Sequence, residues 1–150
     1  MRGSGVKDMA GLSPKLPISR DKEDGYALTK NYIEMVSQNM KNLILTVPGE
    51  RMMDPEFGAG IKRFLFEQHD GSTYSNIYSR IAEQAAIYMP FIKLEGADFY
   101  GPLGKWTTQK GFDSQFVPNP EADPNRLQIE IFFFIKPIDE GASLNLDFAV

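Results

Sequence analysis

The sequence predicts an α+β fold, in which two long amphipathic helices and a short helix pack on a small, mainly antiparallel sheet ending in a C-terminal β-hairpin. Apolar residues recur every three or four positions over residues 28–45 and 72–89, which is the helical period. They fall at every second position over 127–135 and 143–150, which is the period of a strand. With 150 residues, 42% of them hydrophobic, the chain is long enough for one domain with its own core.

The composition narrows the classes of function. The formal net charge is −4, so the chain has no broad electrostatic reason to bind nucleic acid. It has no cysteine and one histidine, His69, which leaves no disulfide framework, thiolate nucleophile or cysteine-ligated zinc. No apolar run approaches the ~20 residues that span a bilayer. We therefore expect a soluble protein with no cofactor, no metal, no nucleic-acid partner and no membrane partner.

The chain divides into an arm and a domain. Residues 1–26 are expected to form an extended arm, mobile in its first part, because prolines and the charge run RDKED precede a turn at Asp24-Gly25. Residues 27–150 are expected to form a single domain. Within it, residues 101–125 hold four prolines and three glycines and predict a long loop, which in a compact domain is functional or mobile.

Three helices are predicted before the sheet. The first should run from Leu28 to Leu45 and end before Pro48-Gly49. Ile61, Phe64 and Leu65 have the i, i+3, i+4 spacing of a short helix. Ser72 or Thr73 is expected to cap the second long helix, which Pro90 ends. Its apolar face is formed by Tyr74, Ile77, Ile81, Ala85 and Tyr88.

The last third of the sequence predicts strands. In FIKLEGADFY, residues 91–100, Phe99 is out of phase with Ile92 and Leu94, so a bulge is predicted at Gly96. In the next strand one face carries five apolar residues, and Phe132 and Phe134 point the other way. The inward set is Leu127, Ile129, Ile131, Phe133 and Ile135. After a turn at 137–141, the terminal strand alternates through Leu144, Leu146, Phe148 and Val150.

The terminal strand has two interpretations of equal weight. An open edge can accept another chain by main-chain pairing, with Phe132 and Phe134 on a face that awaits a partner. Alternatively, the strand is fully covered within the monomer.

The stretch TVPGERMMDPEFG, residues 46–58, gathers Glu50, Asp54 and Glu56 beside Arg51. A glycosidase needs two carboxylates roughly 5 to 9 Å apart. The prolines and Gly49 preclude a regular helix that would fix such a distance. We favour the structural interpretation, in which Glu50 and Arg51 tie a turn and Asp54-Pro55 starts the next one.

Three other features of the sequence have both a functional and a structural interpretation. His69 beside Asp70 lacks a serine motif or second histidine and suits a helix-to-helix turn better than catalysis. Residues 58–60, GAG, lack the lysine of a phosphate loop and suit a tight turn. Trp106, in the predicted loop with Phe112 and Phe116, either anchors a partner or folds back over the core.

The order of elements and the residues themselves resemble a known family over about residues 14–150. Its most specific part is Leu45 to Phe66, where T-x-P-G-E-R is followed by P-x-F-G and a short apolar helix ending in F-E. This pattern is similar to the gene-25-like baseplate wedge family of contractile phage tails and to the sheath initiators of related contractile injection systems. The family's Glu-Pro-Arg triplet falls here on Met89-Pro90-Phe91, so only its proline is retained. The residues that match the first motif are Pro48, Gly49, Glu50, Arg51, Pro55, Phe57 and Gly58.

The resemblance implies a structural wedge component of the virion's tail baseplate, assembled in the host cytoplasm. It would link the core bundle of the larger wedge proteins to the first sheath ring and initiate sheath assembly by β-strand pairing. The implied partners are the tail sheath protein and the larger wedge proteins, with tube or hub proteins as further candidates. The implied wedge contacts are Glu50, Arg51, Met89, Pro90 and Phe91, and the implied sheath contacts are Phe132, Phe134, Leu144, Leu146 and Phe148.

Two other functions stay open. One is a peptidoglycan-cleaving tail lysozyme that uses Glu50, Asp54 or Glu56. The other is a cytoplasmic adaptor of the same fold that holds a regulatory partner, a role that the resemblance implies for one bacterial branch of the family.

Overall fold

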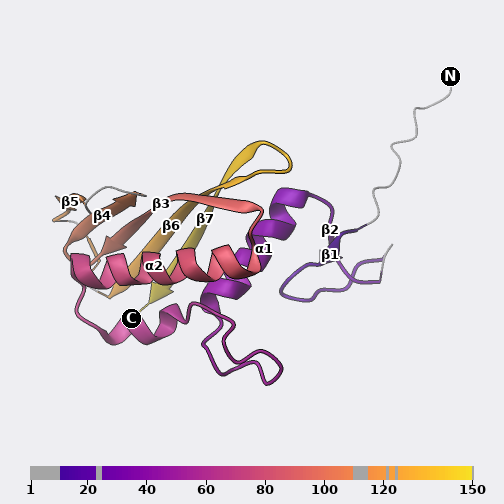
Figure 1. Ribbon diagram of the computed structural model, residues 1–150, viewed down its shortest axis with the longest axis horizontal. Coiled ribbons are helices and arrows are strands. Elements are labelled where there is room, and N and C mark those ends of the chain that lie inside the picture. Colours follow the sequence, from indigo (N-terminus) through magenta and orange to yellow (C-terminus); the bar gives the residue numbers. More distant parts are fainter. Residues whose placement is uncertain (1–10, 23–24, 110–114, 121, 124, 150) are drawn as a thin grey trace. The chain divides into compact units, whose positions relative to one another are not determined.

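The computed structural model describes residues 11–22, 25–109, 115–120, 122–123 and 125–149. It has the predicted α+β class, with helices followed by an antiparallel sheet (Figure 1). In the part of the chain that it describes, no helix is both long and apolar enough to cross a membrane. The elements in chain order are β1 (Ser13–Pro14), β2 (Leu28–Thr29), α1 (Tyr32–Leu45), the 3-10 helix η1 (Ile61–Phe66), α2 (Gly71–Tyr88), β3 (Ile92–Gly101), β4 (Gly104–Gln109), β5 (Gln115–Pro118), β6 (Arg126–Ile135) and β7 (Glu140–Ala149).

The chain forms two compact units that divide between Asn39 and Met40, within α1, whereas the sequence predicted a boundary after residue 26. In the first unit, β1 pairs antiparallel with β2. The backbone N–H of Leu16 donates to Gln38 Oε1 at 2.9 Å, and Gln38 Nε2 donates to the carbonyl of Pro14 at 2.9 Å, so the arm is tied to α1. Asp24 and the residues before Gly11, on which the predicted turn and mobility depend, lie outside the described residues.

The first helix begins later than the sequence predicted. Leu28 and Thr29 belong to β2, and α1 starts at Tyr32. Asn31 explains the start, because its side-chain Oδ1 accepts the backbone N–H of Ile33 at 3.0 Å. A side chain that satisfies a free N–H at the first turn is a typical N-terminal cap.

The second unit is built on a five-stranded sheet with the order β5-β4-β3-β6-β7 and antiparallel neighbours throughout. Helix α2 lies across one face of this sheet (Figure 1). The predicted bulge is confirmed, because the register between β3 and β6 shifts between Leu94 and Gly96. The extra residue returns Phe99 to the helix-covered face, where its ring stacks on Tyr74 at 4.9 Å.

The core lies between this face and α2. The five inward-facing residues predicted for β6 are all fully buried. On α2, the side chains of Tyr74, Ile77 and Ile81 are at most 1% exposed. Burial of such side chains is the main favourable term in folding. The sheet's opposite face is more open, because from Leu127 onward the residues of β6 alternate between buried and half-buried.

The prediction of a long loop at 101–125 is wrong for much of that range. Its described part contains β4 and β5, which extend the sheet beyond β3. Trp106 pairs with Phe99 on one side and with Phe116 on the other, so the strands are stabilised by cross-strand aromatic contacts. Pro118 is the last residue of β5 and Pro102 lies between β3 and β4, so neither removes a central ladder bond.

Two element ends also differ from the prediction. The cap of α2 is Asp70 rather than Ser72 or Thr73, because Asp70 Oδ1 accepts the backbone N–H of Thr73 at 2.8 Å. Strand β7 begins at Glu140, earlier than the predicted 143, and Val150 lies outside the described residues. Asp139 adopts a φ of 55° in the turn before β7, a conformation that aspartate tolerates better than most residues.

Candidate functional site

The loop 46–58 is closed by its own backbone and by Glu50. Glu50 Oε2 accepts the N–H of Val47 at 3.0 Å, and the Glu50 N–H donates to the Val47 carbonyl at 3.0 Å. The Gly49 N–H donates to the carbonyl of Pro55 at 2.8 Å, which draws the two sides of the loop together. The carboxylate proposed for catalysis or partner binding therefore holds a turn.

The middle of the loop is held by stacked side chains. The Arg51 guanidinium lies 3.6 Å from the centroid of the Phe57 ring, and Phe57 meets Tyr88 of α2 edge to face at 4.8 Å. The Tyr88 hydroxyl donates to Asp54 Oδ1 at 3.0 Å. Burial, and then this hydrogen bond to Asp54, raise the pKa of Tyr88 above its usual value. A second of the three acids is thus engaged in structure.

The exit from the loop requires glycine. Gly58 has a φ of 114°, and its N–H donates to the buried Gln84 Oε1 at 2.9 Å. A Cβ at this position would lie 2.2 Å from the carbonyl oxygen of Thr46. The Ala59 N–H donates to the Leu43 carbonyl at 2.9 Å, and the Gly60 N–H donates to the Thr46 carbonyl at 3.0 Å. The loop is therefore anchored to α1 and α2 at its base.

The tip of this loop carries two residues that the sequence reading passed over. Met52 and Met53 are 96% and 98% exposed. The sequence signal for this feature is two adjacent apolar residues within a polar turn.

The second predicted wedge contact, Met89-Pro90-Phe91, is divided by the fold. Met89 is 5% exposed and belongs to the core, Pro90 is exposed and Phe91 is half-buried. Lys136 secures this corner, since its Nζ donates to the Pro90 carbonyl at 3.2 Å and its N–H to the Phe91 carbonyl at 3.0 Å. Only Pro90 and Phe91 present side-chain surface here.

The predicted sheath contacts fall on two faces of the sheet. Leu144, Leu146 and Phe148 pair with Ile131, Ile129 and Leu127, so they share the helix-covered face, and Leu146 is 3% exposed. Phe132 and Phe134 are half-buried on the opposite face, next to the small residues Ser143 and Gly141 of β7. In the described part of the sheet β7 pairs with β6 alone and forms an edge.

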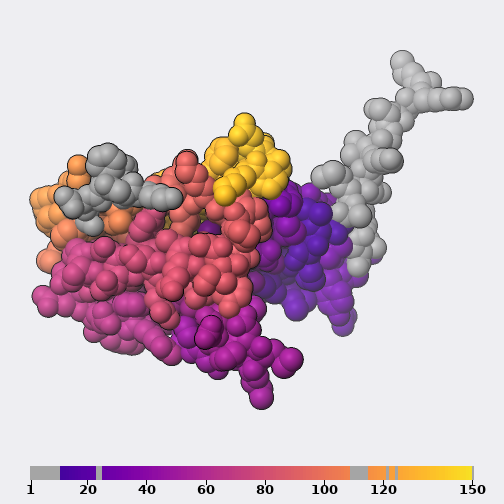
Figure 2. Space-filling model, viewed as in Figure 1, coloured from indigo at the N-terminus to yellow at the C-terminus, as the bar shows by residue number. Residues whose placement is uncertain are grey.

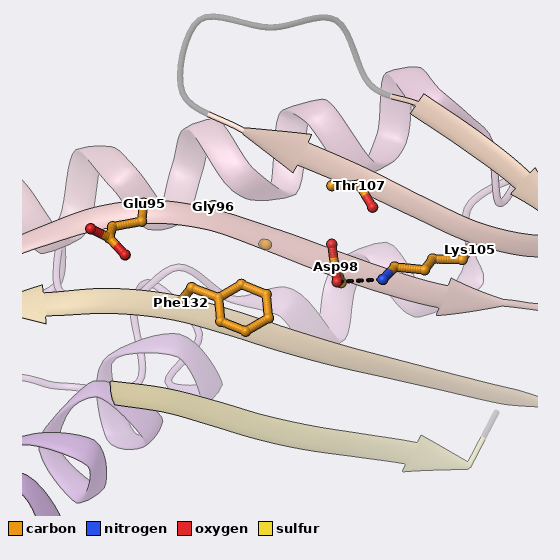
Figure 3. A pocket seen from close by; sticks show the side chains of 7 residues that line it. Glu95, Gly96, Asp98, Lys105, Thr107 and Phe132 are labelled. Atoms are coloured by element: carbon orange, nitrogen blue, oxygen red, sulfur yellow. Dashed lines mark ion pairs between the residues drawn. The ribbon is translucent and has the colours of Figure 1, made fainter. Parts of the chain in front are cut away.

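A hollow on the open face lies beside Phe132 (Figure 3). Asp98, 7% exposed, and Lys105 form an ion pair at 2.6 Å across β3 and β4. The hydrogen bond to Asp98 raises the pKa of Lys105, and the Lys105 ammonium also lies 5.1 Å from the centroid of the Tyr100 ring. A second hollow lies between α2 and β3 and is lined partly by Tyr78, Ala82 and Lys136. Glu50, Asp54 and Glu56 line neither hollow.

His69 and Trp106 have structural surroundings. His69 Nδ1 and the Tyr74 hydroxyl are 3.1 Å apart, and burial raises the pKa of Tyr74 to about 12. Trp106 contacts Phe116 at 4.7 Å and Tyr74 at 6.1 Å between ring centroids, so it folds back over the core. Phe112 lies outside the described residues. Within the ranges that the structure describes, no group of three or more His, Cys, Asp or Glu residues could hold a metal ion.

The fold and part of the sequence are similar to those of known proteins. The fold is similar to that of a proposed tail lysozyme from Geobacter sulfurreducens, with a TM-score of 0.59 and 21% identity over 83% of this chain and 96% of that one. At that identity the likeness shows the fold alone. It is also similar to a chain of the anti-feeding prophage baseplate, with a TM-score of 0.61 and 25% identity over 85% of this chain and 86% of that one. No curated protein matches the sequence. Residues 30–99 match the model of the family described as baseplate wedge protein gp25, so this part of the chain is similar to that family.

Proposed function

We propose that this protein is the wedge component that joins the tail baseplate to the first sheath ring and starts sheath assembly by pairing β7 with a strand of a sheath subunit. The match of residues 30–99 to the baseplate wedge family and the likeness to a baseplate chain support a structural role in a contractile-tail baseplate. The observation that carries the finer proposal is the edge position of β7, whose second side pairs with no described strand.

An edge strand suits this task for a physical reason. A strand at the edge of a sheet presents a row of unpaired N–H and C=O groups, which a second chain can satisfy by continuing the ladder. Strand β7 spans Glu140–Ala149, long enough for a ladder of several bonds. Main-chain bonds would set the register of the first sheath subunit.

Side chains on the open face would add to this pairing. Phe132 and Phe134 are half-buried, and their neighbours across β7 are Ser143 and Gly141. Because both neighbours are small, side chains of an added strand can reach the two aromatic rings over β7. Leu144 and Phe148 are half-buried on the other face and would contribute there.

The wedge-facing contacts are a separate part of the proposal. Pro90 and Phe91 supply surface at the end of α2, whereas Met89 would act by supporting them from the core. Glu50 and Arg51 would act by shaping the loop 46–58, since their side chains cap Val47 and cover Phe57. No carboxylate chemistry is required for either role.

A proline scan of Ser143, Leu144, Asn145 and Leu146 tests the β7 proposal. Alternate residues of an edge strand direct their N–H groups inward to the sheet and outward to solvent. Proline at an inward position removes a ladder bond with β6 and lowers stability, and proline at Leu146 also removes a buried side chain. At an outward position whose own side chain is exposed, proline leaves the unfolding midpoint close to that of wild type. We expect the outward, stable variants to lose binding to purified sheath protein.

The unfolding midpoint shows which proline variants keep the wild-type stability, and only these are compared for binding. The matched surface variant is Ile87→Ser, at a residue of α2 that is 61% exposed, and it should bind normally. If the stable, outward prolines bind sheath protein as well as wild type, strand pairing through β7 is not the mechanism.

A further inference from the structure

At the tip of the loop 46–58, two side chains are almost fully exposed while the residues around them are held by hydrogen bonds and ring contacts. Met52 and Met53 are 96% and 98% exposed, adjacent in sequence, and located on a segment that projects from the surface (Figure 2). We propose that these two side chains are an anchor that inserts into an apolar pocket, rimmed by lysine or arginine, on another protein of the baseplate. The proposal rests on the proposed place of this protein in a baseplate and not on the pairing of β7.

The exposure of the two methionines is fixed by the residues around them. Glu50 and Asp54 are held at the two sides of the tip, by Val47 and by Tyr88, and the Gly49 N–H joins the sides at Pro55. Arg51, directly before Met52, is stacked on Phe57. The polar side chains that flank the methionines are thus held by contacts within the loop and with α2, whereas the methionine side chains are left exposed.

This arrangement lowers the entropic cost of binding. A loop that is already ordered loses little backbone freedom when a partner closes over it, so more of the contact energy appears as affinity. Methionine suits the contact because its unbranched, polarisable thioether adapts to irregular apolar pockets. Two buried methionines can account for a large share of a protein–protein affinity.

The charges of the loop indicate the rim of the partner pocket. Between residues 50 and 56 there are three carboxylates, Glu50, Asp54 and Glu56, against one cation, Arg51, which gives a net charge of −2. Glu56 is exposed, and Arg51 is held over an aromatic ring. Complementarity therefore favours a basic rim and disfavours an acidic one.

Oxidative footprinting tests the burial of the methionines. Hydrogen peroxide transfers one oxygen to an exposed thioether, giving the sulfoxide and water. Oxidation of Met52 and Met53, followed by mass spectrometry, should be rapid in the free chain and at least about tenfold slower in purified baseplates, if a partner covers them. Equal oxidation rates in the two states would overturn the proposal.

Variants test the energetics independently. The double variant Met52→Ser with Met53→Ser should keep the wild-type unfolding midpoint, because both side chains are exposed, yet enter baseplates at least about tenfold less well. Ile87→Ser, at 61% exposure, should enter normally. Normal entry of the double variant would contradict the anchor.

Two further readouts separate this proposal from others. The Met52→Ser, Met53→Ser variant should still bind purified sheath protein, so its defect is distinct from that of the β7 prolines. Glu56→Lys should weaken incorporation, and added salt should weaken that of wild type. Stronger incorporation of Glu56→Lys would show an acidic rim and overturn the assigned partner chemistry.

Discussion

At the scale of single residues, Gly58 is the position on which the loop 46–58 depends most. Its φ of 114° is unfavourable for any residue with a side chain, and a Cβ would meet the Thr46 carbonyl oxygen at 2.2 Å. Gly58→Ala should therefore lower the free energy of unfolding by at least about 3 kcal/mol, from strain and overlap together.

Gly49 provides the matched control for that substitution. Its φ is 96°, but a Cβ there would have no atom within 4 Å. Gly49→Ala should cost only the backbone strain, about 1–2 kcal/mol. Urea denaturation of the two variants measures the difference, and equal losses would show that the contact with Thr46 relaxes at little cost.

The cap of α2 should make stability depend on pH. The N–H of Thr73, and then the Ser72 hydroxyl, lower the pKa of Asp70 from its ordinary value of 3.8. Because the folded-state pKa is the lower one, the carboxylate stabilises the fold above pH 3.8 and this contribution is lost as pH falls through the folded-state pKa. Asp70→Ala should be less stable than wild type at pH 7, with a gap that narrows below pH 3.8.

Asp70→Asn separates the cap from its charge. Asparagine is also a good N-cap but does not titrate, so this variant should keep most of the stability at pH 7 and lose that part of the acid dependence. Thermal unfolding from pH 2 to 7 measures all three proteins. A constant gap between wild type and Asp70→Ala across that range would contradict the role of the carboxylate.

At the scale of elements, the Asp98–Lys105 pair should hold β4 onto β3. Asp98 is 7% exposed, so Lys105→Met leaves a nearly buried carboxylate without its cation and should destabilise the protein by about 1–3 kcal/mol. Adding Asp98→Asn should restore part of that loss. A double-mutant cycle by urea denaturation gives the coupling, and additive effects would show that the pair contributes nothing.

Elements with a strong local pattern could be predicted from the sequence, whereas β4 and β5 could not. The alternation in β6 and the bulge at Gly96 depend on the order of neighbouring residues in the sequence, and the structure confirms both. Strand β4 exists because Trp106 and Thr108 find partners on β3, which is a non-local pairing. Prolines at the strand ends gave the same local signal as a loop.

The candidate site shows the same division between local and spatial information. The turn-forming role of Glu50 could be predicted from Pro48-Gly49 and the absence of regular helix. The positions of Tyr88 and Gln84 under the loop could not, because they come from α2, more than 25 residues away in the chain. The exposure of Met52 and Met53 follows from those contacts, so it too required the fold.

At the scale of the whole molecule, the two compact units should open independently. In the first unit β1 and β2 are two residues each, so few backbone bonds protect their amides. In the second unit β6 lies between β3 and β7, with five fully buried side chains. Amides open with free energies that range from near zero at weakly held segments up to the global value in core strands.

Hydrogen exchange followed by mass spectrometry should therefore show the peptides of β1 and β2 exchanging well before those of β6, under conditions where the native state dominates. Asp98→Asn with Lys105→Met should accelerate exchange in β3 and β4 and leave the rate in β1 and β2 unchanged, because that pair belongs to the second unit alone. Exchange of all strands at one common rate would instead mean that the chain opens as a single cooperative unit, with the division between Asn39 and Met40 having no energetic counterpart.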